Sequence, residues 1–211
     1  MKKRTVNFDS YNSFYDLGVI FTTLDLGSPE PKLVSVEVPY KDGALDLTDY
    51  FGGVSYNNRL ISMHFIMPPV LVGHMDIYHN VQKLLNGKRM KIVFSSDQEY
   101  YYYGRLAVGA FAVDGDTWSF DIVADADPYQ YKDITKTKSI TTSGTIDLIG
   151  GVKTTKLSVA SSAAATLTFG ATTVNLSTGT QTISLALEEG HNYIDVTGTT
   201  NLTIAYTIGR L

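Results

Sequence analysis

The last third of the chain consists of short segments in which apolar and polar residues alternate, separated by glycines. Gly170, Gly179, Gly190 and Gly198 follow one another at intervals of 8 to 11 residues, a spacing typical of turns between short antiparallel strands. Because side chains on a strand point alternately to opposite faces, such segments bury one face against a second sheet. Residues 135–211 are therefore predicted to form a small antiparallel β-sandwich.

Residues 1–134 also favour strands, because they are rich in branched and aromatic residues that pack well on a pleated surface. Strands are expected at 17–26, 32–40, 55–67, 90–96, 100–113 and 116–126. In the segment 32–40, apolar Leu33, Val36 and Val38 alternate with polar neighbours, which predicts a half-buried strand. The first part of the chain is thus predicted to be a β domain of its own.

One segment of the first part has helical periodicity instead. Four apolar residues recur at helical spacing and form one stripe: Ile77, Val81, Leu84 and Leu85. This stripe predicts a helix over about residues 76–86. Asp76 is expected to be its N-cap, and Gly87 is expected to lie just past its end.

The composition changes sharply near residue 135. From there onward Ser and Thr are abundant and charges nearly vanish, whereas acidic residues concentrate in the first part. We therefore expect two domains, 1–134 and 135–211. The formal net charge of −4 argues against a general nucleic-acid binder, which gathers Lys and Arg on one face.

The sequence also excludes some chemistry and some locations. It contains no cysteine, which excludes disulfides, a thiolate nucleophile and a Cys-ligated metal site. The basic N-terminus is not followed by an apolar run of signal-peptide length. The longest uncharged stretch, between Lys156 and Glu188, has polar residues throughout, so we expect no membrane helix.

Candidate metal and catalytic residues gain little support from their spacing. His74, Asp76 and His79 would need a shared face to bind zinc, but His74 precedes the expected helix. The Asp-Gly-Asp turn at 114–116, even with Asp121, lacks the remaining ligands of a calcium loop, so a hairpin turn is expected there. No motif of a catalytic triad or phosphate-binding loop occurs. We predict no catalytic, cofactor or metal site.

Four consecutive tyrosines are the most unusual local feature: Tyr100, Tyr101, Tyr102 and Tyr103. On a strand they would place two rings on each face. One interpretation is structural, with the inner pair in the core and the outer pair covering a hairpin. The other is an interface, because Tyr is amphipathic and frequent at protein contacts.

An ordered set of features runs through the segment VPYKDGALDLTDYFGGVSYNNRLISMHF at 38–65. Its marker residues are Asp42, Gly43, Gly53, Tyr56, Asn58 and Arg59. LLNGK at 84–88, Tyr103-Gly104-Arg105 and Ala126-Asp127-Pro128-Tyr129 follow in the same order. Over residues 1–135, the chain resembles the siphophage distal tail proteins.

The resemblance implies an all-β fold. Its N-terminal part would be a β-sandwich or split-barrel-like domain with one short helix and a long hairpin. A small antiparallel sandwich, galectin-like, would follow it. The family is structural rather than enzymatic and needs no cofactor or metal.

The resemblance also implies a place in the virion. Six copies usually close into a ring at the tail tip, between the tail tube protein and the tail-tip hub protein of the baseplate. Tape measure and DNA pass through its channel without specific binding. Such a protein is made in the bacterial host cytoplasm, in some cases from a prophage, and does not contact a membrane.

The marker residues also allow a physical interpretation. Gly43 and Gly53 permit backbone angles that a side chain would forbid. Arg59 follows Asp42, Asp46 and Asp49 in the sequence, and a bidentate pair with one of them would pin the loop to the strand. An interface role for Arg59 is the alternative interpretation.

Two other function classes remain open from the sequence. A carbohydrate- or receptor-binding module of a tail tip would use the second sandwich, with an exposed aromatic platform near Tyr193 or Tyr206. A small glycan hydrolase would need a pocket with two carboxylates. The motif order favours the structural ring over both.

Overall fold

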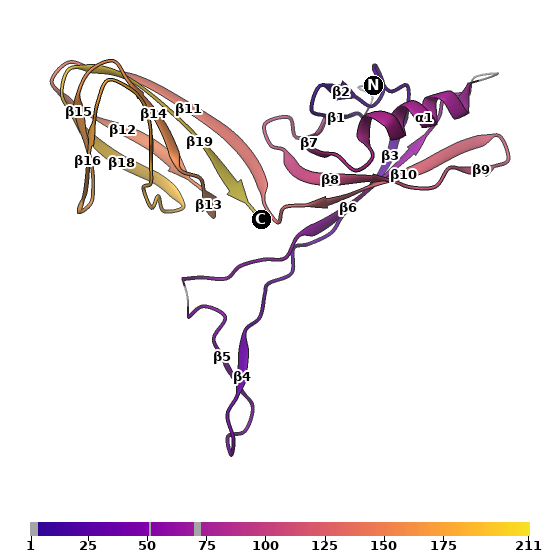
Figure 1. Ribbon diagram of the computed structural model, residues 1–211, viewed down its shortest axis with the longest axis horizontal. Coiled ribbons are helices and arrows are strands. Elements are labelled where there is room, and N and C mark those ends of the chain that lie inside the picture. Colours follow the sequence, from indigo (N-terminus) through magenta and orange to yellow (C-terminus); the bar gives the residue numbers. More distant parts are fainter. Residues whose placement is uncertain (1–3, 51, 70–72) are drawn as a thin grey trace. The chain divides into compact units, whose positions relative to one another are not determined.

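The computed structural model describes residues 4–50, 52–69 and 73–211. They form two compact units, Met1–Pro128 and Tyr129–Leu211 (Figure 1). Strands dominate both units, and the one helix of the described residues is short, which confirms the predicted all-β fold. The first strand of the second unit begins at Gln130, so the change in composition at residue 135 falls within this strand.

The first unit is built around one antiparallel sheet with the strand order β2-β1-β7-β8-β10-β6-β3, in which β9 also pairs with β10. Its strands are β1 (Val6–Phe8), β2 (Tyr11–Asn12), β3 (Ile20–Leu26), β6 (Arg59–Ile66), β7 (Arg89–Phe94), β8 (Tyr102–Val108), β9 (Ala112–Asp114) and β10 (Thr117–Ala126). The expected turn at 114–116 is a hairpin turn, because Asp114 pairs with Thr117.

This sheet curls around an aromatic core. The rings of Phe21 on β3 and Phe94 on β7 lie 6.0 Å apart, although three strands separate β3 from β7 in the sheet. Phe65 stacks on Phe120 at 5.9 Å and is fully buried. Burial of each such side chain contributes about 1.5–3 kcal/mol. Strands β3 and β1 do not pair with each other, so the curled sheet stays open along one side.

The helix α1 (His74–Leu85) closes part of this core. Val81 and Leu85 of the predicted stripe are fully buried, and Ile77 and Leu84 pack partly buried against the same cluster. The predicted N-cap was wrong, because Gly73 occupies that position and Asp76 lies in the first turn. A glycine serves there because its φ of 100° lies in the left-handed region.

Two further strands of the first unit, β4 (Ser35–Glu37) and β5 (Ala44–Asp46), pair only with each other. Every residue of both strands is exposed. The predicted half-buried strand at 32–40 is therefore wrong in its burial: the alternation is present, but no layer of the first unit covers it.

The second unit is a sandwich of two antiparallel sheets. One sheet has the order β11-β19-β14-β17, with β13 beside β19, and the other has the order β12-β18-β15-β16. The strands are β11 (Gln130–Ile140), β12 (Ser143–Gly150), β13 (Lys153–Thr154), β14 (Leu157–Ser161), β15 (Ala165–Phe169), β16 (Thr172–Leu176), β17 (Gly179–Ile183), β18 (Gly190–Thr197) and β19 (Thr200–Arg210).

The inner faces of the two sheets form a single apolar cluster. Ile194 and Val196 of β18 are buried in it, whereas the neighbours Tyr193 and Asp195 are exposed. The predicted sandwich is confirmed, and its galectin-like character stays a prediction. Among the described residues, the structure has no helix with the length and apolar character needed to cross a membrane.

Candidate assembly surface

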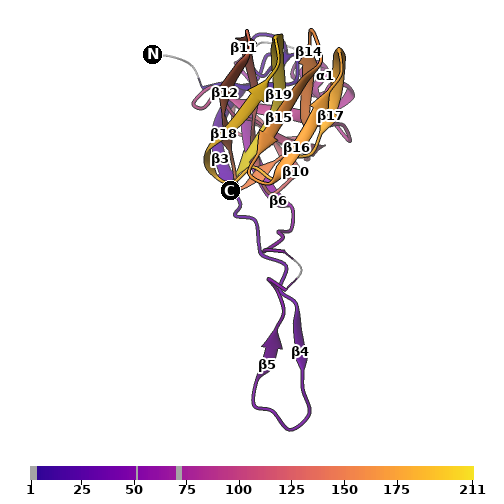
Figure 2. The ribbon, with the colours of Figure 1, turned by 90° about the vertical axis from the view of Figure 1, so that its left-hand side faces the viewer.

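A long two-stranded arm, residues 27–58, leaves the sheet after β3 and returns to it at β6 (Figures 1 and 2). Its base continues the pairing of β3 with β6. The N–H of Gly27 donates to the Leu60 carbonyl at 2.9 Å, and that of Lys32 donates to Ser55 at 2.8 Å. A Cβ on Gly27 would lie 2.7 Å from the same Leu60 oxygen, so this close pairing requires glycine.

The outer part of the arm is an amphipathic hairpin. Val36 lies directly opposite Leu45, so both side chains are on one face. The N–H of Leu47 donates to the Val34 carbonyl at 2.8 Å, which continues the same register. We call this side the apolar face of the arm, made of Val34, Val36, Val38, Leu45 and Leu47. The opposite face carries Ser35, Glu37, Ala44 and Asp46.

Four of the five side chains of the apolar face of the arm are exposed in the single chain, and Leu47 is half-buried. Val34 and Val36 are each 46% exposed, and Leu45 is 41% exposed. The arm also presents Leu33, Tyr40 and Tyr50 as large exposed apolar side chains. Exposed apolar side chains gathered on one face are typical of surfaces that contact another molecule. The sequence analysis missed it, although the alternation that defines it was visible.

The tip of the arm is a tight reversal between β4 and β5. The N–H of Lys41 donates to the Val38 carbonyl at 3.2 Å. Tyr40 has a φ of +63°, which is uncommon for an aromatic residue. Gly43 supplies the second left-handed position, with a φ of +75°. Thus Asp42-Gly43 lies in the predicted turn, and Tyr40 is the residue held in an unfavourable backbone conformation.

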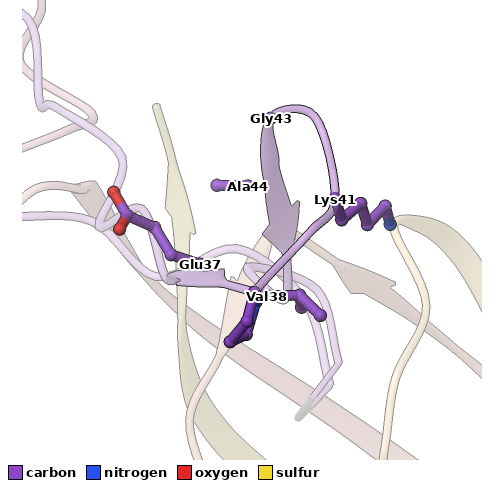
Figure 3. A pocket seen from close by; sticks show the side chains of 6 residues that line it. Glu37, Val38, Lys41, Gly43 and Ala44 are labelled. Atoms are coloured by element: carbon purple, nitrogen blue, oxygen red, sulfur yellow. The ribbon is translucent and has the colours of Figure 1, made fainter.

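An open crevice of about 460 Å³ lies at this tip (Figure 3). Figure 3 shows Glu37 and Lys41 extending to opposite sides of the hairpin rather than toward a common point. All the described residues that line the crevice are exposed. A small-ligand site needs polar groups that converge on the ligand, and these two side chains diverge. The crevice is therefore interpreted as the open surface of the hairpin and not as a small-ligand site.

The other marker residues lie at the base of the arm. Gly53 has a φ of +103°, which requires glycine. Tyr56 is half-buried and bridges to Pro31, Asn58 is exposed, and Arg59 opens β6. These residues connect the arm to the sheet, and their role as a structural motif stays a prediction.

Arg59 does not form the predicted pair with an aspartate. It is 5% exposed, and its Nε has no hydrogen-bond partner among the described residues. Its guanidinium carbon instead lies 5.4 Å from the centre of the Tyr102 ring, a cation–π contact. The expectation failed because Arg59 points into the first unit, whereas Asp42 and Asp46 are exposed on the arm.

Asp46 has a local partner of its own. Its Oδ1 accepts a hydrogen bond from the Thr48 N–H at 2.9 Å. Hydrogen bonding from the Thr48 side chain and then from the Thr48 backbone holds the pKa of Asp46 below its usual 3.8. The Thr48 hydroxyl oxygen also accepts from the Val34 N–H at 3.1 Å, which links the two strands of the arm.

The tyrosine run divides between the core and the surface. Tyr102 is buried, whereas Tyr100, Tyr101 and Tyr103 are half-buried. The Lys91 Nζ lies 4.0 Å from the centre of the Tyr101 ring, and the Arg89 Cζ lies 4.7 Å from that of Tyr103. Only one ring of the expected inner pair is fully in the core, and an interface role for the run stays a prediction.

The candidate metal and catalytic residues do not converge. No group of three or more His, Asp or Glu side chains that could hold a metal ion occurs in the described part of the chain. His74 is inside the helix, not before it as expected, and its ring stacks on Trp118 at 4.6 Å. His64 Nδ1 lies 2.6 Å from Asp121 on the neighbouring strand, in an exposed pair.

Comparison with known proteins gives a likeness in fold. No family model and no curated relative matches the sequence. The crystal structure of the Dit protein (gp 19.1) of phage SPP1 does match, with a TM-score of 0.66 and 16% identity, over 100% of both chains. That protein is described as a paradigm of the hub adsorption apparatus in phages that infect Gram-positive bacteria.

A chain of the activated baseplate of phage p2 is a weaker match. Its TM-score is 0.48 at 9% identity, over 96% of this chain and 97% of that one. The SPP1 match alone shows that the whole chain, both units included, has the fold of a phage hub protein. At the level of the fold, the resemblance found in the sequence is confirmed.

Proposed function

We propose that the chain is a distal tail protein of a siphophage, a structural component of the tail tip without enzymatic activity. Copies of it form a closed ring, of six subunits by analogy with the family. The observation that carries this proposal is the apolar face of the arm, which no other strand or helix of the first unit covers. The full-length likeness to a phage hub protein supports it.

A ring fits the free surfaces of the first unit. Strand β3 ends the curled sheet, so one side of it has no strand partner among the described residues. Free strand edges invite pairing with another chain. The arm and the free edge are different surfaces of one subunit, so a contact between the arm of one copy and the edge of the next is head-to-tail, and such contacts close into a ring when the rotation permits.

The ring would join the tail tube protein on one side and the tail-tip hub protein on the other. The acidic first part of the chain suits a channel through which tape measure and DNA pass without being held. The site of action is the phage tail tip, after synthesis in the host cytoplasm, and a prophage is one source of such a gene.

The mass of the purified chain in solution, followed by electron microscopy, tests this proposal directly. We expect a multimer of defined size, hexameric if the analogy holds, that appears as a ring with a central hole. A chain that stays monomeric up to its solubility limit, alone and with its tail tube protein, contradicts the proposal. So does a purified chain that cleaves host cell-wall glycans.

A carbohydrate- or receptor-binding role for the second unit is the alternative, and one surface favours it. Tyr193 is 65% exposed and lies beside His191, whose Nδ1 is 2.8 Å from Asp147. Tyr206 does not contribute, because it is buried and its hydroxyl donates to the Ile149 carbonyl. Burial raises the pKa of Tyr206.

The isolated chain on an array of cell-wall glycans would test this alternative. Binding that is lost in Tyr193→Ala and retained in Tyr40→Ala would support it. Absence of binding would leave the second unit with a purely structural role.

A further inference from the structure

A second cavity of the first unit lies on the open side of the curled sheet. Its volume is about 210 Å³, and Phe21, Leu24 and Phe94 supply its apolar lining. Thr22, Ser96 and Arg4 add polar groups. The cavity exists because β3 approaches β7 without pairing to it, which leaves space between the ends of the sheet.

The size and lining of this cavity suit an aromatic ring. An apolar cavity of about 150 Å³ holds benzene in a protein interior, so 210 Å³ is sufficient for a phenol ring. The polar groups offer partners for the hydroxyl of a tyrosine, which needs one when it is buried.

Tyr40 at the tip of the arm is a protruding aromatic side chain, the complement of such a cavity. Its relative exposure is 110%, so the chain covers no part of its ring. Its left-handed backbone costs free energy that no contact of the ring with the described residues offsets. Strained residues of this kind cluster at binding sites, and an exposed tyrosine is a common interface anchor.

The charges of the two surfaces are also complementary. The tip carries the carboxylates of Glu37 and Asp42 against the single amine of Lys41, and all three are exposed. The cavity carries the guanidinium of Arg4, and no acidic residue is among the described residues that line it. Opposite charges at the rim of a contact fix its orientation and register.

We propose that Tyr40 of one copy inserts its ring into the cavity formed by Phe21, Leu24 and Phe94 of the next copy. The inference rests on the proposed ring and names the contact that closes it. Tip and cavity are different surfaces of the same chain, so the contact is head-to-tail and repeats around the ring. Its occupant is a second copy because the tip matches the cavity in shape, polarity and charge.

Cysteine cross-linking tests this contact, because the natural chain has no cysteine. The variant with Lys41→Cys and Ser96→Cys keeps the Tyr40 ring. It is oxidised, and its products are separated without reductant. We expect a ladder of covalent multimers, because a disulfide forms only when the two Cβ atoms come within about 4.5 Å. The matched control combines Ser96→Cys with Tyr50→Cys, which replaces an exposed tyrosine away from the tip, and should give no ladder.

The outcomes separate this inference from the proposed ring. If electron microscopy shows rings but Lys41→Cys cross-links no more than the Tyr50→Cys control, the inserted tyrosine is overturned and the ring stands. A chain that never assembles overturns both.

Two substitutions provide an independent readout. Tyr40→Asn removes the ring and keeps a residue that tolerates the left-handed conformation, so the melting temperature should not fall. Association should weaken by about tenfold or more, as for loss of an aromatic anchor. Tyr40→Phe should retain association close to that of the natural chain. Equal association of Tyr40→Asn and the natural chain contradicts the proposal.

Discussion

The arm of the first unit and the sandwich of the second are both built from strands with alternating apolar and polar residues. The apolar face is buried in the sandwich and exposed in the arm. In β18, Ile194 and Val196 lie buried beneath the opposite sheet. In the arm, Val36 and Leu45 share a face just as clearly, yet both remain exposed. Alternation therefore defines an apolar face without specifying what covers it, and the proposed ring would supply the missing cover for the arm.

The largest expected effect comes from the covered face. Leu148 of β12 is fully buried in the sandwich, so Leu148→Ala should destabilise the second unit by about 2–5 kcal/mol, through lost burial and the cavity left behind. Urea unfolding followed by circular dichroism measures the loss. Trp118, the single tryptophan, reports on the first unit, and its fluorescence transition should not move. A loss below about 1 kcal/mol would contradict the packing described here.

A charge on the uncovered face should act on assembly instead of folding. Leu45→Lys places an ammonium group on the apolar face of the arm and should weaken association by about tenfold or more, with an unchanged melting temperature. Ala44→Lys is the matched control, because it adds the same charge one residue away, on the face that carries Glu37. Sedimentation measures both. Equal association of the two variants would show that the apolar face is not an interface.

Much of the fold was predictable because local patterns decide it. The helical stripe around Val81 and the glycine-punctuated alternation after residue 135 each have one satisfactory structural solution. The helix start was not predictable in detail, since Gly73 replaces the expected side-chain cap. Of the strand predicted at 32–40, only β4 (Ser35–Glu37) forms, and its burial depends on tertiary surroundings that no local pattern contains.

The residues of the candidate assembly surface were harder to predict from the sequence than the fold. Arg59 stood near three aspartates in the sequence, yet the chain directs it into the first unit, toward Tyr102. Tyr40 carried no sequence signal, because its significance comes from a left-handed backbone and complete exposure. The cavity is lined by residues of β3 and β7, which are far apart in the sequence. Only the curvature of the sheet brings these two strands together, and no local sequence pattern shows that curvature.

Arg59 lies where the arm meets the covered core, and two substitutions there sharpen the comparison. Arg59→Ala should destabilise the first unit by about 1–3 kcal/mol, because the buried stem and its contact with Tyr102 are lost. Arg59→Met should retain most of the stability, since the buried Nε has no hydrogen-bond partner to lose. Trp118 fluorescence during urea unfolding measures both. An unchanged melting temperature together with normal ring formation in Arg59→Ala would contradict a structural role.

The smallest expected effect concerns how an arm without a core holds its shape. Hydrogen bonds from Thr48 lower the pKa of Asp46 below 3.8, so they favour the charged carboxylate of the folded hairpin. The resulting stabilisation is present above pH 3.8 and is lost as the pH falls through the lower folded pKa. A carboxyl titration by NMR should place Asp46 below 3.8 in the natural chain and closer to 3.8 in Thr48→Ala. The same midpoint in both chains would mean that the hairpin is not formed in solution before a partner covers it, which would set the arm apart from the sandwich even more strongly.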